Sequence, residues 1–277
     1  MTDRPIGVFD SGVGGLTVLR ALAAALPRED FIYLGDTARL PYGTKSPETV
    51  ERYFLQCAEA LADRGVKCLV VACNTASSVG LSHVGDRIGS LPVVGVIEPG
   101  AEAACKASRS GHIAVIATER TVSGGAYQEA ILRRRQDARI TARATPLFVA
   151  LAEEGLCHGP IAEGIAGHYL DSMFVGRLSA QSIDADVPDT LLLGCTHFPM
   201  LAETIRRVVG TGVSIVDSAE TTAASVATML ADIGLSRSSR GGRVRFLATD
   251  SVDRFVKVGG GFLDRRIAPD EVELVDL

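Results

Sequence analysis

The chain has 277 residues, of which 47% are hydrophobic and 22% charged, and its net charge at pH 7 is -5. This length is enough for one large α/β domain or two smaller ones, each with a core of its own. The acidic balance argues against a nucleic-acid binder, which would carry a clustered basic face. We interpret the one dense basic run, Arg133 to Arg135, as a solvated helix face.

The first predicted strand begins almost directly after Met1. We therefore expect no signal peptide, and no apolar run approaches the roughly 20 residues that a membrane helix needs. We expect a cytoplasmic protein that binds no membrane. In a reducing compartment its six cysteines are expected to be free thiols.

Short apolar runs alternate with helix-like segments along the chain. Segment 47–64 is typical of an amphipathic helix, because Val50, Phe54 and Leu61 fall at helical spacing and Ser46 can cap its start. Strands that alternate with helices predict mainly parallel sheets, whose ligands lie beyond the carboxyl ends of the strands. The apolar runs predict strands at residues 6–10, 31–36, 68–73, 93–97, 113–118, 140–146, 190–195, 214–217 and 244–250.

The second half of the chain repeats the pattern of the first. The run at 111–118 resembles the opening strand, and LLLGCTHFP (191–199) resembles LVVACNTASS (69–78) in pattern although not in identity. We therefore expect an α/β fold with two similar lobes, each a mainly parallel sheet flanked by helices, and an active site in the cleft between them. The first lobe is predicted to comprise residues 1–97 and 211–277, and the second residues 98–210.

Cys73 and Cys195 are the most informative residues, because each ends an apolar run where a ligand site is expected. Taken singly, a cysteine at a strand end is usually a small buried hydrophobe. Here both cysteines are followed at once by hydrogen-bonding residues, which favours a site with one thiol on either side of a small molecule. These residues are Asn74 and Thr75 after the first cysteine, and Thr196 and His197 after the second.

Three further places carry candidate site residues. Asp10 and Ser11 follow the first strand and lead into a glycine-rich turn, where a backbone can approach an anion closely. That turn matches neither GxGxxG nor GxxxxGK[ST], which disfavours a dinucleotide or a nucleoside triphosphate. Pro41, Tyr42 and Gly43 form a turn that is either a binding loop or a plain loop, and Glu153 is either a site residue or a helix-surface carboxylate.

A metal ion and pyridoxal phosphate are the rival interpretations of the chemistry. Cys195 and His197 could ligate a metal, but the paired CxxC or HxxxH spacing of structural zinc sites is absent. Pyridoxal phosphate needs a Schiff-base lysine, and of the four lysines only Lys45 lies near a candidate motif. We expect neither a metal nor an organic cofactor.

Six motifs then carry a resemblance to a known family. They are GVFDSGVGGLTVL, YLGDTARLPYGTKS, VVACNTASS, GVIEPGA, PLFVALAEEG and LLLGCTHFP, in this order from residue 7 to about residue 200. In these motifs the chain resembles the glutamate racemases of the aspartate/glutamate racemase superfamily, which supply D-glutamate for bacterial peptidoglycan. Aspartate racemases are similar but typically carry Glu where this chain has His197. That difference favours glutamate as the substrate.

The resemblance implies a cofactor-independent racemase, forming a homodimer, in which two thiols act on the substrate α-carbon. It implies catalytic roles for Cys73 and Cys195, assisted by Asp10, His197 and Glu153. It also implies that Asp10 with Ser11, Pro41 with Tyr42 and Gly43, Asn74 with Thr75, and Thr196 with His197 bind the substrate.

The chain departs from the family pattern at two places. ATERT (117–121) replaces GTxGT, so contacts by Thr118 and Thr121 are open, and Ala150 replaces a proline near Glu153. Three alternatives also remain at this stage. They are a racemase for aspartate or another acidic amino acid, a two-lobed binding protein for a small anion, and a hydrolase with one cysteine nucleophile.

Overall fold

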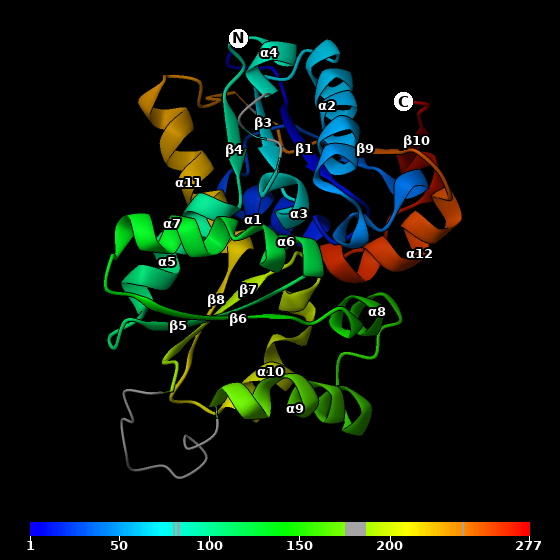
Figure 1. Cartoon of the computed structure of the whole chain (residues 1–277). Helices are drawn as coiled ribbons and strands as arrows, with labels where there is room; N and C mark the ends of the chain where they lie inside the picture. Colours follow the sequence, from blue (N-terminus) through cyan, green and yellow to red (C-terminus); the bar gives the residue numbers. More distant parts are fainter. Residues whose placement is uncertain (80, 82–83, 175–186, 240) are drawn as a thin grey trace. The chain divides into compact units, whose positions relative to one another are not determined.

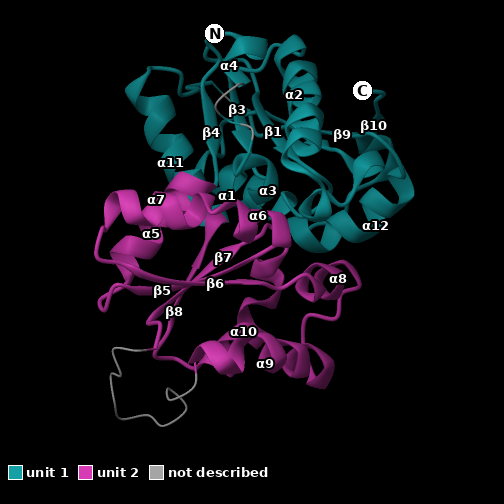
Figure 2. Ribbon diagram, in the orientation of Figure 1, with its two compact units in different colours: residues 1–96, 219–277 teal, residues 97–218 magenta. Residues whose placement is uncertain are grey.

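The computed structural model describes residues 1–79, 81, 84–174, 187–239 and 241–277. Contacts within the chain divide it into two compact units (Figure 2). Unit 1 consists of Met1–Val96 and Ala219–Leu277, and unit 2 consists of Ile97–Ser218. No helix in the described ranges is long and apolar enough to cross a membrane.

In the described part of unit 1, six parallel strands form one sheet in the order β10-β9-β2-β1-β3-β4 (Figure 1). The central strand β1 is buried along its whole length, as expected for a parallel sheet that helices cover on both faces. The strands are β1 (Ile6–Asp10), β2 (Phe31–Gly35), β3 (Cys68–Val71), β4 (Val93–Gly95), β9 (Val244–Ala248) and β10 (Val272–Leu274).

Helices cover both faces of this sheet. Ser46 caps α2, as predicted, by accepting a hydrogen bond from Thr49 N at 3.3 Å, and the apolar face of α2 packs on the side of the sheet that presents Phe9. On the other side, Phe255 of α12 stacks against the rings of Tyr33 and Phe246, 6.0 Å from each. The helices are α1 (Leu16–Ala25), α2 (Pro47–Asp63), α3 (Asn74–Ser77), α4 (Val84–Ile88), α11 (Ser218–Asp232) and α12 (Val252–Leu263), with 3-10 turns η1 (Thr37–Arg39), η2 (Tyr42–Thr44) and η4 (Pro269–Glu271).

In the described part of unit 2, four parallel strands form a second sheet in the order β6-β5-β7-β8. Ile113 and Leu192 on one face of this sheet pack against Ala101 of α5 and Ile131 of α7. The ring of Phe148 in α8 contacts the rings of Tyr169 in α9 and Phe198 in η3, at 5.3 and 5.4 Å.

The strands and helices of unit 2 follow one another in the alternation that the sequence predicts. The strands are β5 (His112–Ala117), β6 (Arg139–Ala144), β7 (Thr190–Gly194) and β8 (Ser214–Asp217). The helices are α5 (Ile97–Ala107), α6 (Glu119–Gly124), α7 (Ala126–Arg134), α8 (Leu147–Glu153), α9 (Pro160–Phe174) and α10 (Ala202–Val209), with the 3-10 turn η3 (Phe198–Leu201).

The two sheets repeat one strand order, since β2-β1-β3-β4 in unit 1 corresponds to β6-β5-β7-β8 in unit 2. The predicted fold class is therefore confirmed, and each of the nine predicted strands is present. Both predicted boundaries differ from the structure, the first by one residue, since Ile97 belongs to unit 2. Residues 211–218 belong to unit 2 and not to the first lobe, because β8 pairs with β7. The short edge strand β10 was not predicted.

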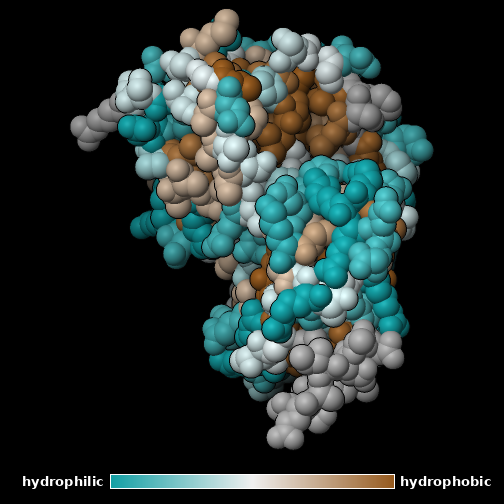
Figure 3. Space-filling model, turned by 90° about the vertical axis from the view of Figure 1, so that its left-hand side faces the viewer, coloured by the Kyte–Doolittle hydropathy of each residue, from teal (hydrophilic) through white to brown (hydrophobic). Residues whose placement is uncertain are grey.

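Arg133 and Arg134, at the end of α7, are exposed and paired with Glu98, as a solvated helix face requires, whereas Arg135 follows the helix and is half-buried. Arg133 donates to Glu98 Oε1 at 2.5 Å, and Arg135 lies 3.4 Å from Asp137. Hydrophilic residues cover much of the lower part of the face shown in Figure 3, whereas apolar residues gather in its upper part.

Candidate active site

The first cluster of predicted site residues lies at the carboxyl end of the unit 1 sheet. Asp10 ends β1, is 1% exposed, and accepts a hydrogen bond from Gly12 N at 2.9 Å. Tyr33 on the neighbouring strand donates to Gly12 O at 2.8 Å and so fixes the other side of this turn. A Cβ at Gly15 would come within 2.5 Å of Asp10 Cβ, so only glycine permits this turn.

Cys73 lies beside this turn, at the start of α3. Its sulfur is 3.5 Å from Ser11 Oγ and accepts from Ala76 N at 3.4 Å, so the thiol is the N-cap of α3. Asn74 and Thr75, in the first turn of this helix, are each 3% exposed. The structure therefore brings together the predicted residues from β1 and β3.

Burial, and after it the charge of Asp10, raise the pKa of the Cys73 thiol from its ordinary value of 9.0 to about 12, although hydrogen bonds with Ala76 and Ser11 lower it. Relative to water, forming this thiolate costs on the order of 4 kcal/mol more. Even an unperturbed thiol costs roughly 2 kcal/mol to ionise at neutral pH, and the cost at Cys73 is added to that. In this structure Cys73 is accordingly a thiol.

The predicted turn at Pro41, Tyr42 and Gly43 belongs to the same unit. Tyr42 is 2% exposed and its hydroxyl donates to Asp36, the residue that follows β2. The 3-10 turn η2 that begins at Tyr42 contacts α3, the helix that Cys73 caps. This turn is therefore part of the same strand-end cluster.

The second cluster lies at the carboxyl end of the unit 2 sheet. Cys195 directly follows β7, and its sulfur is 3.8 Å from His197 Nδ1. The other ring nitrogen, Nε2, is 3.1 Å from Glu153 Oε1, at the end of α8. Thr196 Oγ1 is 3.4 Å from the same Nδ1. The structure thus joins a thiol, an imidazole and a carboxylate in one chain of contacts.

These contacts favour one of the two neutral tautomers of His197. When Nε2 carries the proton and donates it to Glu153, Nδ1 presents a lone pair toward the Cys195 thiol. His197 is 7% exposed, so most of the imidazole is shielded from solvent. The rings of Phe148 and Phe198 meet edge to face with their centres 5.4 Å apart, and they pack α8, which ends at Glu153, against η3, which directly follows His197.

Thr118 and Thr121 lie at the end of β5, next to the strand that carries Cys195. Thr118 caps α6, accepting from Thr121 N at 3.5 Å, and the two hydroxyls are 3.0 Å apart. Ala117 pairs with Gly194 across β5 and β7, so Thr118 and Cys195 leave the sheet side by side. ATERT therefore keeps two hydroxyls at this strand end despite its departure from GTxGT.

Sequence reasoning missed two tyrosines and an aspartate. Tyr33 and Tyr127 are fully buried, and burial raises the pKa of both; the charge of Asp10 contributes at Tyr33. Asp36 lies within the motif YLGDTARLPYGTKS, where no local pattern distinguishes it from a loop residue. A tyrosine inside an apolar strand or helix carries no signal that separates it from core packing.

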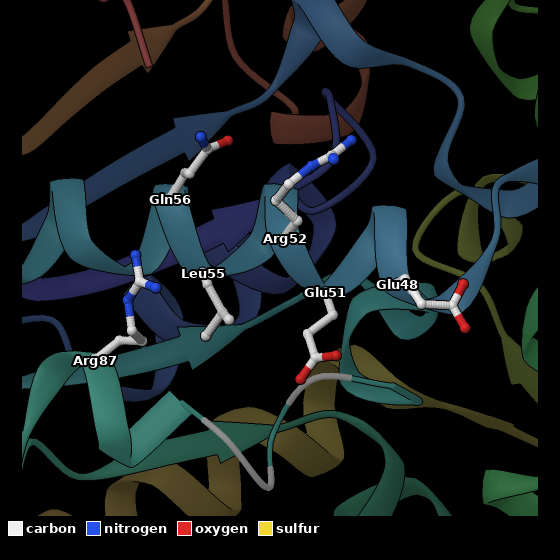
Figure 4. A pocket seen from close by; sticks show the side chains of 6 residues that line it. All are labelled: Glu48, Glu51, Arg52, Leu55, Gln56 and Arg87. Carbon is white, nitrogen blue, oxygen red and sulfur yellow. The ribbon is translucent and has the colours of Figure 1, made fainter.

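A cavity of about 320 Å³ lies on the outer face of α2 (Figure 4). Its lining includes Glu51, Leu55 and Arg87 but none of the predicted site residues. Within the described ranges, no three His, Cys, Asp or Glu side chains are grouped as a metal site would require. The two strand-end clusters are therefore the candidate active-site groups.

Comparison with known proteins now assigns the family. The Asp/Glu/Hydantoin racemase family model matches residues 6–226. The chain belongs to this family. A glutamate racemase of Geobacter metallireducens is 48% identical to this racemase-family chain over 265 residues, which are 95% of this chain and 94% of the relative. The resemblance that the motifs predict is confirmed.

Solved structures of racemases share the whole fold. The glutamate racemase of Francisella tularensis in complex with D-glutamate has a TM-score of 0.89 and 34% sequence identity, and covers 100% of this chain and 98% of its own. The glutamate racemase of Thermus thermophilus in complex with beta-chloro-D-alanine has a TM-score of 0.85 and 43% identity, with the same two coverages. The match extends over both units of this family member.

Proposed function

We propose that this chain is a glutamate racemase, which interconverts L- and D-glutamate without a cofactor and supplies D-glutamate for peptidoglycan. One observation carries the proposal. Each of two topologically equivalent sheets ends in a buried cysteine with its own acid–base partner, in a chain 48% identical to a glutamate racemase. The two clusters serve one substrate molecule, and each thiol serves one face of its α-carbon.

The reaction exchanges one proton for another at the α-carbon. A thiolate takes the α-proton from one face, the bond electrons remain on the substrate as a carbanion, and the opposite thiol donates its proton to the other face. After each turnover the thiol and the thiolate have exchanged places. Following the family resemblance, Cys73 takes the proton from D-glutamate and Cys195 takes it from L-glutamate.

Asp10 has two effects on Cys73 that depend on whether substrate is bound. In the free protein its negative charge raises the pKa of the thiol. When the ammonium group of glutamate binds beside Asp10, the two charges offset one another and the thiolate becomes easier to form. Substrate binding itself therefore prepares Cys73 as a base.

His197 performs the corresponding task for Cys195. Its Nδ1, 3.8 Å from the sulfur, accepts the thiol proton, and Glu153 at 3.1 Å stabilises the resulting imidazolium. This arrangement resembles the nucleophile, base and orienting acid of cysteine hydrolases, but here the thiolate acts as a base. A second thiol in unit 1 has no role in a hydrolase mechanism.

The carbanion beside a carboxylate is the main energetic obstacle, and polar groups at the strand ends offset it. Ser11, Asn74 and Thr75 in unit 1 and Thr196 in unit 2 bind and stabilise the negative oxygens of the substrate. The turn of Pro41, Tyr42 and Gly43 binds a carboxylate, and Thr118 and Thr121 add hydroxyls in unit 2. Glutamate is favoured over aspartate by His197. A homodimer and a cytoplasmic location remain predictions.

The test is hydrogen exchange at the α-carbon. Purified protein is incubated with L-glutamate in deuterated water with no added cofactor, and circular dichroism and mass spectrometry follow the substrate. We expect loss of optical activity and deuterium in both isomers, unchanged by hydroxylamine, which would trap pyridoxal phosphate. L-Aspartate and L-glutamine serve as parallel substrates. Faster exchange of aspartate would contradict the substrate assignment, and no exchange of any substrate would favour the small-anion binding protein.

A further inference from the structure

A buried carboxylate, Asp36, holds together three chain segments of unit 1. It is 0% exposed, and its main-chain N–H donates to Asp10 O at 3.0 Å. Its Oδ1 accepts from Thr249 Oγ1 at 2.9 Å, while its Oδ2 accepts from Arg39 Nε at 2.6 Å and from the Tyr42 hydroxyl. A buried carboxylate is stable only when such donors surround it, so the segments and the charge depend on each other.

Arg39 anchors this carboxylate to α2. Its guanidinium donates to Gln56 Oε1 at 2.5 Å and to Cys57 Sγ at 3.3 Å, and lies 4.5 Å from the centre of the Tyr53 ring. Burial lowers the pKa of Arg39, but its contacts with Asp36 outweigh this and raise it above its ordinary value. The pair is therefore an ion pair whose position α2 determines.

On its other side, Asp36 fixes the turn of residues 41–43. The Tyr42 ring lies 6.3 Å from the ring of Phe9, the residue before Asp10, and the Tyr42 hydroxyl donates to the Asp36 carboxylate. Leu40, just before the turn, packs against Gly12, where a Cβ would lie 3.1 Å from it. The turn thus lies between the Asp10 loop and α3, the helix that Cys73 caps. Its contacts with Gly12 and with α3 both depend on the position of Tyr42.

We propose that Asp36, together with Arg39 and Thr249, is a positioning group that holds the turn of residues 41–43 in its substrate-binding form. It does not touch the reacting atoms. The inference rests on the proposed function, in which this turn binds a carboxylate of glutamate. Asp36 therefore determines how tightly glutamate is bound, whereas the rate of proton transfer depends on the two thiols and their partners.

The same strand supplies a matched control. Asp30 lies at the other end of β2 and is also a mostly buried carboxylate bound by arginines, with Arg237 at 2.7 Å and Arg243 at 3.1 Å. Hydrogen bonds from Arg243 and Arg237 outweigh burial and lower the pKa of Asp30 to about 2. Asp30 is thus also a carboxylate held by charged donors, but it lies at the amino end of the sheet, away from the candidate site.

The experiment compares Asp36→Asn with Asp30→Asn by steady-state kinetics in both directions, together with thermal unfolding. Asp36→Asn is expected to raise KM for both isomers by about tenfold and to change kcat by less than about threefold. Asp30→Asn is expected to lower the melting temperature and leave KM unchanged. Tyr42→Phe, which removes only the hydroxyl, should raise KM by about threefold and keeps the test valid if Asp36→Asn does not fold.

Each outcome decides the inference. Unchanged KM in Tyr42→Phe and Asp36→Asn, in a wild-type chain that racemises glutamate, overturns the positioning role alone. An equal rise of KM in Asp30→Asn also overturns it, because the effect would then be one of general stability. A wild-type chain that exchanges no glutamate overturns the proposed function first, and this inference with it.

Discussion

Strand β3 of unit 1 and strand β7 of unit 2 occupy the same place in two sheets of the same order. Each is followed by a cysteine, but the partners of the two cysteines come from different parts of their units. Beside Cys73 the acid is Asp10, on the adjacent strand, and it acts directly through its charge. Beside Cys195 the acid is Glu153, on a helix, and it acts through His197.

This difference shows how one fold, used twice, can surround two equivalent thiols with different partners. The repeat places a thiol at equivalent strand ends, and in the proposed mechanism the neighbouring residues of each thiol determine how its proton leaves. The main-chain bonds of Asp36 N to Asp10 O and of Thr145 N to Ala117 O mark equivalent places in the two sheets, at 3.0 and 2.9 Å. A carboxylate lies there in unit 1 and a threonine in unit 2, so only unit 1 builds the turn-holding cluster.

Replacing either thiol tests whether racemisation needs both Cys73 and Cys195. Cys73→Ser and Cys195→Ser should each lower kcat/KM by about 10³-fold or more in both directions, because a serine hydroxyl is a far weaker acid than a thiol. Polarimetry measures the loss. Cys68→Ser and Cys157→Ser, at buried cysteines outside the proposed machinery, are controls that should retain activity. Normal racemisation by either site variant would refute the two-thiol mechanism.

Each of these two variants should still remove the α-proton from one enantiomer, and the two variants should act on opposite enantiomers. Removal of the α-proton from a 3-chloroglutamate expels chloride, and water then converts the product to 2-oxoglutarate and ammonia. Cys195→Ser should perform this elimination on the D-isomer, through Cys73, and Cys73→Ser should perform it on the L-isomer. Elimination by either variant with the opposite handedness would reverse the assigned faces.

Replacing the two assisting residues separates their roles. Asp10→Asn and His197→Asn should each lower kcat by about 10²-fold. The enantiomers have equal free energy in water, so kcat/KM must stay equal in the two directions, and the asymmetry appears in isotope effects instead. With α-deuterated substrate, Asp10→Asn should show a large effect for D-glutamate and a small one for L-glutamate, and His197→Asn the reverse.

His112 offers a control for this pair. It is a buried histidine of unit 2 at the opposite end of its sheet, where Nε2 lies 2.9 Å from Thr141 Oγ1. His112→Asn should leave both isotope effects as in the wild type. Equal isotope effects for the two isomers in Asp10→Asn and His197→Asn would mean that neither residue serves one thiol in particular.

Much of this arrangement could be predicted from sequence, for reasons that the two cysteines illustrate. An aliphatic run that ends in Cys and a polar pair identifies a buried strand and its carboxyl end, so local pattern alone locates Cys73 and Cys195. The family resemblance supplied Glu153 only as a candidate assisting residue, and its contact with His197 was not predicted, because 44 residues and a strand separate the two.

The ends of strands, and the residue at which the chain passes from unit 2 back to unit 1, were harder to predict. The strand predicted at 68–73 ends at Val71, because the backbone turns so that Cys73 can cap α3. Residues 211–217 carry no composition that distinguishes a strand of one sheet from a strand of the other. The role of Asp36 depends on donors from Thr249, over two hundred positions away in the chain, which no local pattern reveals.

The charge beside Cys73 should appear in the reactivity of that thiol. Only the thiolate reacts with iodoacetamide, and a pKa of about 12 means that the rate at Cys73 should still rise about tenfold per pH unit at pH 10. Asp10→Asn removes a charge that raises this pKa, so it should speed alkylation of Cys73 at a given pH and leave Cys195 unaffected. Mass spectrometry of the two peptides measures both rates. A plateau at Cys73 below pH 9 would contradict the assigned shift.

The smallest expected effect concerns the acid that acts at a distance. Glu153→Gln keeps an oxygen that can accept from His197 Nε2 but removes the charge that stabilises the imidazolium, so kcat should fall by only about three- to tenfold. Because His197 serves Cys195, the isotope effect should grow for L-glutamate and not for D-glutamate. Glu154→Gln, at the exposed neighbouring carboxylate, is the control and should change neither quantity. Equal effects of the two substitutions would show that Glu153 contributes only as one of the surface charges. His197 would then assist Cys195 without Glu153.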